Sequence, residues 1–569
     1  MIIVPEERIA EMKRQGWWGD DTADDLLARH VATFGDGEAL IDPPNLESIA
    51  GLAPQRLRWN EVEAGVAARA ALLHAHGLGK DDVVLLQLPN SVEQTLFYLA
   101  CFRLGIIVSP APAQYRLGEL TGIARRTDAK AAITTARIGT HAHGETMLAL
   151  KREWPALKAL FVLGDAPEGT VAVEPALAAI GDAEIAAAAE AARAAGVTAD
   201  DVATICWTSG TEAEPKGVPR SHNEWIIMGD AVARGARLEG GARVLNPFPM
   251  VNMAGLSTGL FNWLACGGVL VQHHPFDLGV FLAQIREEKI EYTVAPPAVL
   301  NAMLNNPALV QGVDFTRLSR IGSGSAPLSE WMVRSFDETY GVEILNIFGS
   351  NEGASFLSSS TDVPDPGTRG QCFPRFGEHG FEWDYHYAPS LRTRLVDPDS
   401  GLEVTEPEQP GEMRIKSPMI FSGYWRAPDV TARAFDEDGW FRTGDLFAIT
   451  GDDGRYYRFV GRHKDIVIRG GMNISAEEIE NHLLGHPAVV DVAVVGAPDA
   501  DMGERLCACI VAPEGISMEA LNRYLVEEKR VAIFKQIERL ELMDALPRNP
   551  VGKVLKRELR AQLFGQGHA

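Results

Sequence analysis

The chain has 569 residues, of which 46% are hydrophobic, so we expect a large buried core and more than one domain. Its formal net charge of −24 at pH 7 argues against sequence-independent binding of nucleic acid, which depends on Lys and Arg neutralising phosphates. The sequence contains no run of about 20 uncharged apolar residues, which argues against a conventional transmembrane helix.

The N-terminal residues and the cysteines predict a cytoplasmic location. Residues 1–8 (MIIVPEER) reach charged side chains before any apolar segment long enough for a secretory signal. The six cysteines are scattered without C-x-x-C pairs, and a chain of this size needs no disulfides to fold. We therefore expect reduced thiols, with Cys507 and Cys509 as two residues on one face of a strand rather than a metal site.

The first part of the chain, to about residue 200, alternates short apolar runs with helical patterns, which is typical of parallel α/β layers. An alanine-rich stretch at 183–195 predicts a surface helix. The clearest strands and helices of this part are expected at 82–88, 91–104, 106–109 and 131–134.

A glycine-rich segment at 207–217 (WTSGTEAEPKG) follows the apolar run 202–207, which we interpret as a buried strand. Backbone N–H groups, hydroxyls and a lysine at the end of a strand can hold a polyphosphate. Ser221 and Glu224 form an S-x-x-E capping box ahead of a helical segment, so strand, phosphate loop and helix are expected in that order. The spacing differs from G-x-x-x-x-G-K-[ST], which excludes a Walker-type loop and leaves an ordinary Gly-rich connection as the alternative.

A second series of strands is expected at 243–248, 269–272, 292–295 and 342–348. The last strand ends in Phe348-Gly349-Ser350-Asn351-Glu352-Gly353, and open α/β sheets bind ligands at the carboxyl ends of their strands. Phe348 could stack on a base there, and Glu352 could bind Mg²⁺ through oxygen. Further along, Asp445 follows a turn in the segment 440–445 and could accept hydrogen bonds from ribose hydroxyls.

The last part of the chain predicts a compact α+β unit of about 100 residues, an ordinary domain size. Ser475 and Glu478 form a second capping box, and Lys553 follows Gly552 on a loop, where its compact charge could bridge two oxyanions. We place the boundary at Lys464, giving a domain at 1–463 and a domain at 464–569. Strands are expected at 456–460, 466–469, 489–495, 506–511 and 539–543, and helices at 476–484, near 518–528 and from about 554.

These separated motifs, in this order and over nearly the whole chain, strongly resemble the adenylate-forming superfamily. That superfamily includes acyl-CoA synthetases, aryl-acid adenylating enzymes, luciferases and the adenylation domains of peptide synthetases. The resemblance implies an α/β fold, with a large multi-layer α/β N-terminal domain and a small mobile α+β C-terminal domain. It also implies ATP, Mg²⁺ and coenzyme A as reactants or cofactors.

The resemblance assigns a role to each motif residue. Lys553, Glu352, Thr208 and Lys216 would be catalytic, with Glu352 as the metal ligand, Lys464 as the hinge, and Gly470 and Gly471 beside the thiol tunnel. The nucleotide site would comprise Thr208, Ser209, Gly210, Thr211, Lys216, Gly217, Ser325, Ala326, Pro327, Asn346, Phe348, Gly349, Ser350, Asn351, Asp445 and Arg462. The acid pocket would comprise Trp225, Met250, Asn252, Met253, Gly255, Ser323 and Gly324.

Some positions depart from the family pattern. Glu212 and Ala213 stand where Ser or Thr and Gly are usual, and a carboxylate beside phosphates is repulsive unless it turns outward or serves Mg²⁺. Phe348 and Asn351 replace the usual Tyr and Thr. Asn252 lies in the segment where many acyl-CoA synthetases carry a gating His, and it can serve either as a substrate contact or as a structural cap.

The sequence predicts an ATP-dependent acid–thiol ligase, specifically an acyl-CoA synthetase acting through an acyl-adenylate. Its apolar pocket with few polar groups suits a cyclic or medium-sized carboxylic acid. One alternative is a stand-alone aryl-acid ligase that loads the phosphopantetheine of a carrier protein, and a remote one is a non-catalytic nucleotide sensor. A homodimer is the candidate assembly.

Overall fold

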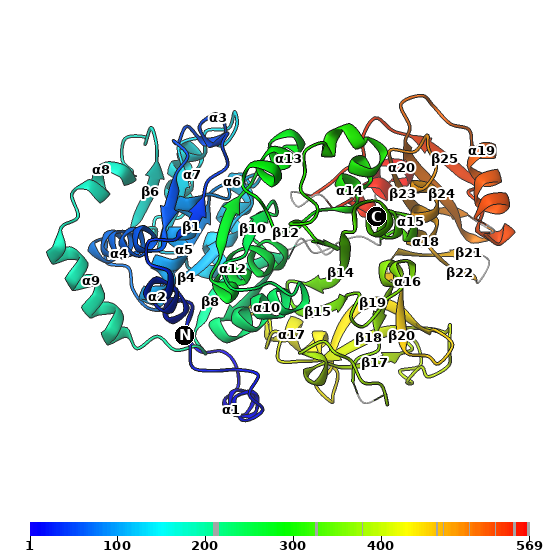
Figure 1. Cartoon of the computed structure of the whole chain (residues 1–569), viewed down its shortest axis with the longest axis horizontal. Helices are drawn as coiled ribbons and strands as arrows, with labels where there is room; N and C mark the ends of the chain where they lie inside the picture. The colour runs from blue at the N-terminus through cyan, green and yellow to red at the C-terminus, as the bar shows by residue number, and fades with distance from the viewer. Residues whose placement is uncertain are drawn as a thin grey trace.

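The protein is described from a computed structural model that covers residues 1–208, 215–324, 328–377, 379–462, 465–469, 472–499, 501–529, 531–549 and 553–565. Four β-sheets organise these residues (Figure 1). Two are large α/β sheets, coloured blue to green in the figure. A smaller antiparallel sheet, formed by β16 to β20, is coloured mainly yellow. The last part of the chain forms a compact unit coloured orange to red.

The first sheet has seven strands in the order β7-β6-β5-β3-β4-β8-β9, with parallel neighbours except for the pair β8 and β9. The strands are β3 (Val83–Gln87), β4 (Ile107–Pro110), β5 (Ala131–Thr135), β6 (Ala159–Leu163), β7 (Val171–Ala172), β8 (Val202–Thr208) and β9 (Lys216–Ser221). All residues of β3, β4, β5 and β6 are buried, as in parallel sheets covered on both faces. The predicted parallel α/β layers are confirmed.

The helices around this sheet begin and end at local signals. Ser91 Oγ accepts from Gln94 N at 3.2 Å at the start of α5, and Gly105, with φ +69°, ends it. The predicted capping box before α10 is present, because Ser221 N also donates to Glu224 Oε2 at 2.8 Å. The helices in this part are α1 (Glu6–Arg14), α2 (Ala23–Phe34), α3 (Leu46–Ala50), α4 (Trp59–Ala75), α5 (Val92–Leu104), α6 (Leu117–Thr127), α7 (His143–Glu153), α8 (Val173–Ala178), α9 (Asp182–Ala195) and α10 (His222–Gly235).

The passage from the phosphate loop to α10 differs from the prediction. The chain does not enter the helix directly, because residues 216–221 first form β9 antiparallel to β8, with Thr208 opposite Lys216. Pairing along β8 satisfies the backbone groups of this buried segment, which a direct entry into the helix would leave unpaired. The order is therefore strand, loop, strand and helix.

The second sheet has eight strands in the order β15-β14-β13-β12-β10-β11-β1-β2, with antiparallel strands at its two edges. The strands are β1 (Glu38–Ile41), β2 (Arg56–Arg58), β10 (Arg243–Asn246), β11 (Val269–Gln272), β12 (Tyr292–Val294), β13 (Arg320–Gly324), β14 (Glu343–Ser350) and β15 (Gly353–Ser358). The strands expected in this part of the sequence are confirmed. The helices are α11 (Met253–Gly255), a π-helical turn (Leu256–Leu260), α12 (Phe261–Cys266), α13 (Leu278–Glu287), α14 (Pro297–Asn305), α15 (Glu330–Tyr340) and α16 (Pro366–Gln371).

The structure confirms the placement of one predicted site residue and corrects that of another. Glu352 directly follows the carboxyl end of β14, as predicted, in the turn where β15 folds back antiparallel to β14. Asp445 does not follow a turn but lies inside a strand, paired with Arg462 of the neighbouring strand. That third sheet is antiparallel, in the order β16-β20-β19-β18-β17: β16 (Cys372–Pro374), β17 (Arg392–Val396), β18 (Pro410–Lys416), β19 (Phe441–Thr450) and β20 (Tyr456–Arg462), with α17 (Pro428–Ala434) between β18 and β19.

The C-terminal unit has its own sheet and its own hydrophobic core. Ser475 Oγ caps α18 as predicted by accepting from Glu478 N, whereas the Glu478 carboxylate accepts from Lys535 Nζ at 2.7 Å instead of completing the box. The final helix begins at Lys556 rather than at 554. The elements are β21 (Ile466–Arg469), β22 (Met472–Ser475), α18 (Ala476–Leu484), β23 (Asp491–Asp499), β24 (Gly503–Val511), α19 (Met518–Arg523), β25 (Arg539–Leu542) and α20 (Lys556–Phe564).

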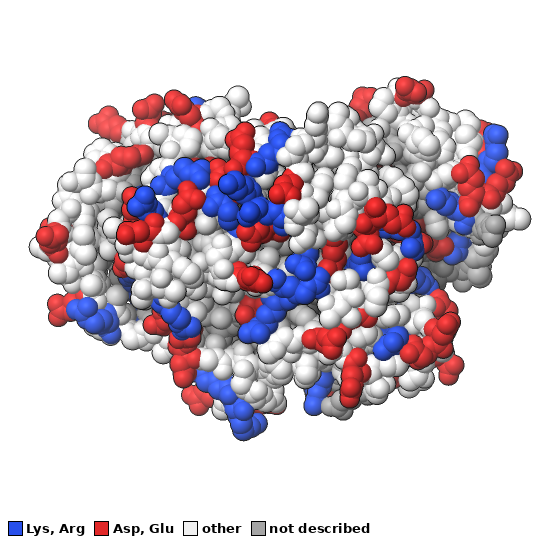
Figure 2. Space-filling view, in the orientation of Figure 1, with Lys and Arg blue, Asp and Glu red and all other residues white. Residues whose placement is uncertain are grey.

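Charges and cysteines agree with a globular chain. All six cysteines are free and buried, and Cys507 and Cys509 lie on one face of β24, as predicted. Basic and acidic side chains are interspersed on the face seen in Figure 2. Within the described ranges, no helix combines the length and the apolar character that a bilayer-spanning segment needs.

Candidate active site

A fully buried arginine joins two segments of the chain that carry predicted site residues to a third segment that carries none. Arg220, on β9, is 1% exposed. Its Nε and Nη2 donate to Asn351 O at 3.0 and 2.9 Å, and its Nη1 donates to Met419 O at 3.0 Å. Burial lowers the pKa of Arg220, and the carboxylates of Glu224 and Glu352 oppose that shift. The guanidinium therefore fixes the hairpin turn of Glu352 against the strand that leaves the phosphate loop.

The side chain of Asn351 adds two further links. Its Oδ1 accepts from Met253 N at 2.8 Å, and its Nδ2 donates to Trp207 O at 3.2 Å. Trp207 precedes the end of β8, and Met253 belongs to the predicted acid pocket. The segments predicted to bind phosphates and the acid thus meet at the β14–β15 turn.

Charged side chains of opposite sign gather next to this turn. The carboxylate of Asp445 is 10% exposed, and its Oδ1 lies 3.3 Å from Arg462 Nε. Burial raises the pKa of Asp445. The positive charges of Arg462 and Lys553 lower this pKa, and the negative charge of Glu352 raises it. Glu352 Oε1 accepts from the hydroxyl of Tyr424 at 2.8 Å. The charges of Arg462, Lys553, Glu352 and Asp465 therefore all act on the Asp445 carboxylate.

Lys553 is contributed by the C-terminal unit. Its N donates to Asn549 Oδ1 at 2.8 Å, and Asn549 N donates to Lys553 O at 2.8 Å, so both ends of the loop 549–553 are tied together. The side chain reaches solvent, yet desolvation and the charge of Arg462 lower its pKa to about 8, against the opposing carboxylate of Asp445. A lysine with such a pKa is a functional-site candidate because it lies in a cluster of specific charge partners.

Residues predicted for the acid pocket and for the nucleotide site lie on two paired strands. Ser323 and Gly324 of β13 face Asn346 and Ile347 of β14 in register. The Asn346 amide donates to the carbonyls of Arg369 and Gly370 at 3.2 and 2.9 Å, so it is engaged with α16. Phe348 is half-buried and packs edge-on against Phe447 at 5.2 Å between ring centroids, while Gly349 is exposed and Ser350 half-buried.

The predicted acid-pocket residues are largely committed to internal contacts. Trp225 is fully buried, donates to Thr204 Oγ1 at 2.9 Å and stacks on Phe261. Met250 is also fully buried. Asn252 caps α11, because its Oδ1 accepts from Gly255 N at 3.2 Å, so the structural role left open by the sequence is present. A Cβ on Gly255 would lie 2.0 Å from Pro249 O, which explains the glycine. Ser323 Oγ donates to Ala295 O at 2.8 Å.

Several predicted residues lie outside the described part of the chain. They are Ser209, Gly210 and Thr211, with the atypical Glu212 and Ala213, then Ser325, Ala326 and Pro327, and finally Lys464, Gly470 and Gly471. Their assignments stay predictions. Thr208, Lys216 and Gly217 flank the first of these gaps, and Lys216 Nζ lies 5.4 Å from the centroid of the Tyr424 ring.

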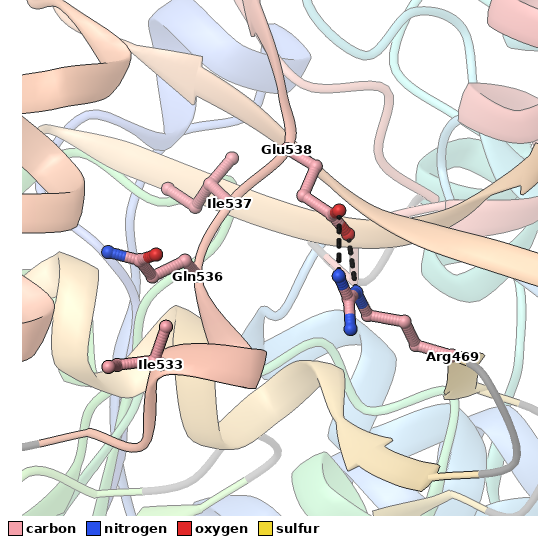
Figure 3. Close-up of a pocket in the computed structure, with 5 residues that line it drawn as sticks. All are labelled: Arg469, Ile533, Gln536, Ile537 and Glu538. Atoms are coloured by element: carbon pink, nitrogen blue, oxygen red, sulfur yellow. Dashed lines mark hydrogen bonds and ion pairs between the residues drawn. The ribbon is translucent and has the colours of Figure 1, made fainter. Parts of the chain in front are cut away.

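An open pocket of about 570 Å³ lies in the C-terminal unit (Figure 3). One of its lining residues, Arg469, immediately precedes Gly470 and Gly471 in the sequence. Arg469 Nε and Nη2 donate to the two carboxylate oxygens of Glu538 at 2.7 and 3.0 Å across one side of it. Ile533, 75% exposed, lies on the other side in the figure. The lining is completed by Gln536 and Ile537.

Sequence reasoning missed Arg220 and Tyr424. No sequence pattern identifies Arg220, because a lone arginine after a glycine-rich segment has no spacing that indicates which distant carbonyls it will bind. Tyr424 lies 72 residues from its carboxylate partner, and no local pattern relates positions so far apart.

Replacing Arg220 with methionine should lower the Tm by roughly 2–5 °C, because the carbonyls of Asn351 and Met419 would lose buried charged donors. Arg234→Met is the matched control on α10, since Arg234 is 52% exposed and pairs with Asp230 one turn away; it should change Tm by less than about 1 °C. Thermal scanning of both variants tests this. An unchanged Tm for Arg220→Met would contradict the inference that Arg220 stabilises the turn between β14 and β15.

Comparison with known proteins identifies the class of the protein. A family model described as AMP-binding enzyme matches residues 27–425, and one described as AMP-binding enzyme C-terminal domain matches residues 478–553. The chain therefore belongs to the AMP-binding enzyme family, whose two-part fold of a large N-terminal and a smaller C-terminal region it shares. The resemblance to adenylate-forming enzymes is confirmed.

Individual relatives extend over almost the whole chain. A medium-chain fatty-acid–CoA ligase of Escherichia coli (strain K12) is 28% identical over 98% of this chain and 93% of its own length. A 2,3-dihydroxybenzoate-AMP ligase of Bacillus subtilis (strain 168) is 28% identical over 98% of this chain and 96% of its own. The crystal structure of ATP-bound MatB from Rhodopseudomonas palustris is 26% identical, with a TM-score of 0.75 over 96% of this chain and 100% of that one. The relatives thus include CoA ligases and acid-adenylating enzymes.

Proposed function

We propose that the protein is an AMP-forming acyl-CoA synthetase, which activates a carboxylic acid as an acyl-adenylate and transfers the acyl group to coenzyme A. The observation that carries the proposal is the convergence of Lys553 and Arg462 with Asp445 and Glu352, which come from two units of the chain. A polyphosphate needs local cations in a protein whose net charge is −24, and this cluster supplies them.

The residues present fit ATP and Mg²⁺. Asp445 is a buried carboxylate suited to two ribose hydroxyls, and Arg462 beside it can reach a phosphate. Glu352 offers carboxylate oxygen, the donor type that Mg²⁺ prefers, and Lys216 opposite Thr208 marks the mouth of the phosphate loop. When bound, Mg²⁺ would neutralise phosphate charge.

The two half-reactions place different demands on these residues. In the first, an oxygen of the substrate carboxylate attacks the α-phosphorus and pyrophosphate leaves, while Lys553 stabilises the charge that develops between the two anions. In the second, the thiolate attacks the acyl carbonyl and AMP leaves. We assign Lys464 as the hinge of the domain at 464–569 and Gly470–Gly471, which follow Arg469 in the sequence, as the flank of the thiol tunnel.

The acid is proposed to be a cyclic or medium-sized carboxylic acid, since Trp225, Met250 and Met253, which are predicted to surround it, are apolar side chains. The second candidate function is transfer to the phosphopantetheine of a carrier protein, which the similarity to an AMP ligase for 2,3-dihydroxybenzoate favours. A cytoplasmic location and a homodimeric assembly stay predictions from the sequence.

Isotope exchange between ATP and pyrophosphate, measured with a panel of carboxylic acids, tests the first half-reaction. Free CoA is then added with the best acid. Exchange that needs an acid, followed by acyl-CoA formation, is expected. Acid-dependent exchange without acyl-CoA would favour the carrier-loading function, and exchange without any acid would contradict the ligase.

Replacing Asp445 with alanine should raise KM for ATP and lower kcat/KM for ATP by roughly 10–150-fold, the loss expected for hydrogen bonds to a charged group. Asp438→Ala is the control, because its side chain is 72% exposed on the segment before β19. Steady-state kinetics of pyrophosphate release distinguishes the two variants. An unchanged KM for ATP in Asp445→Ala would rule out the ribose contact.

A further inference from the structure

The segment from Ser417 to Trp425 lies between two parts of the candidate active site. Phe421 N donates to Glu352 O at 2.8 Å, so the segment runs beside the hairpin turn. Trp425 N donates to Gly217 O at 2.9 Å, so the same segment also runs beside the start of β9. It therefore contacts the predicted metal carboxylate at one end and the exit of the phosphate loop at the other.

The side chain of Tyr424 contacts a charged group from each part. Its hydroxyl donates to Glu352 Oε1 at 2.8 Å. The ammonium of Lys216 lies 5.4 Å from the centroid of its ring, within the range of a cation–π interaction. One half-buried phenol thus links a carboxylate on the β14–β15 turn with a lysine on β9.

The position of Tyr424 is itself fixed from several sides. Its N donates to Thr431 Oγ1 at 2.9 Å, and its ring packs edge-on against Phe421 at 4.8 Å. From the N-terminal helix α1, Arg8 donates to the carbonyls of Ser417 and Phe421, both at 3.3 Å. A tyrosine held this firmly loses little side-chain freedom when it orients its partners.

We propose that Tyr424 is a positioning residue for adenylation, which rests on the proposed function. Its hydroxyl holds one oxygen of Glu352, so that the other carboxylate oxygen would remain available to bind Mg²⁺. Its ring holds Lys216, so that the metal ligand and the phosphate cation keep a constant separation. Mg²⁺ requires near-octahedral geometry, and removing a hydrogen bond behind a metal ligand typically lowers affinity or activity about 10–100-fold.

Two substitutions separate the contacts. Tyr424→Phe removes the hydroxyl and keeps the ring, whereas Tyr424→Leu removes both. We expect Tyr424→Phe to raise the Mg²⁺ concentration for half-maximal adenylation at saturating ATP by about 10-fold, and Tyr424→Leu in addition to raise KM for ATP. Tyr340 lies on α15 and its ring stacks on Phe315, so Tyr340→Phe is the control and should leave both quantities unchanged.

Metal binding is also measured without turnover. Calorimetry with Mn²⁺ and a non-hydrolysable ATP analogue should show about 10-fold weaker metal binding in Tyr424→Phe, at an unchanged Tm. A double-mutant cycle with Glu352→Gln then tests whether the hydroxyl acts through Glu352, in which case Tyr424→Phe should have little further effect on metal binding in the Glu352→Gln background.

Unchanged metal binding in Tyr424→Phe, or effects that add fully to those of Glu352→Gln, would overturn the proposal. If Tyr424→Leu fails to fold, Tyr424→Phe carries the test alone. Failure of the proposed function is distinguishable, because the wild-type protein would then show no acid-dependent exchange while the calorimetric comparison would still report on Tyr424.

Discussion

Replacing Lys553 with alanine should slow adenylate formation by about 10²–10³-fold, the typical effect of removing one group that stabilises developing negative charge. Thioester formation from a supplied acyl-adenylate should stay close to the wild-type rate, because the second half-reaction breaks no bond to pyrophosphate. Single-turnover measurement of each half-reaction gives the two rates separately. Lys529→Ala is the control, since Lys529 lies over the ring of Tyr524 in the same unit.

The pH dependence provides a second test of Lys553. Its pKa lies at about 8, below the ordinary 10.5, because desolvation and Arg462 disfavour the charged form. The ammonium is therefore present below about pH 8 and lost above it, so kcat/KM for ATP should fall on the alkaline side with a midpoint near pH 8. Lys553→Arg should remove this limb, because a guanidinium stays protonated. Near-normal pyrophosphate release by Lys553→Ala would contradict the assignment.

Replacing Lys464 with proline should lower thioester formation by about 10²-fold or more while adenylation survives. Lys464 lies outside the described residues, but the strands on either side of it belong to different sheets: β20 to the large unit and β21 to the C-terminal unit. A hinge must adopt two backbone conformations, and proline restricts φ to one narrow range and removes an N–H. Because the structure has Lys553 beside Asp445, adenylation needs no rotation from this arrangement.

Lys464→Ala keeps the backbone freedom and should retain both half-reactions, which makes it the matched control for the proline. Rapid-quench kinetics of each step, with the Tm of the C-terminal unit measured in parallel, separates a trapped hinge from unfolding. Equal loss of both half-reactions in Lys464→Pro would mean that the substitution disrupts the small domain, and the hinge assignment would then have no support.

Tyr424 and Arg220 set a limit on what a single substitution in the metal or phosphate motifs can reveal. Glu352 is held through its side chain by Tyr424 and through the preceding carbonyl by Arg220. A variant such as Glu352→Ala therefore also removes the carboxylate that accepts from the Tyr424 hydroxyl. The loss measured in such a variant includes the loss of this hydrogen bond as well as that of the predicted metal contact.

The local elements and the family could be predicted from the amino-acid sequence alone. The strand at 202–207, the helix beginning at Ser91 and the capping box of Ser221 with Glu224 were predicted correctly, because periodicity and capping depend on residues at most four positions apart. The order of the motifs, each short and separate along the chain, was enough to identify adenylate-forming enzymes, which the family matches confirm.

The contacts between the separate motifs could be seen only in the tertiary structure. It showed that β9 intervenes before α10, that Glu352 lies in a hairpin turn and Asp445 within a strand, and that Arg220 and Tyr424 hold the turn in place. Arg220 contacts residues 131 and 199 positions away along the chain. Such contacts depend on which sheets pack together and on which buried donors must find acceptors, and no pattern within a single segment specifies either.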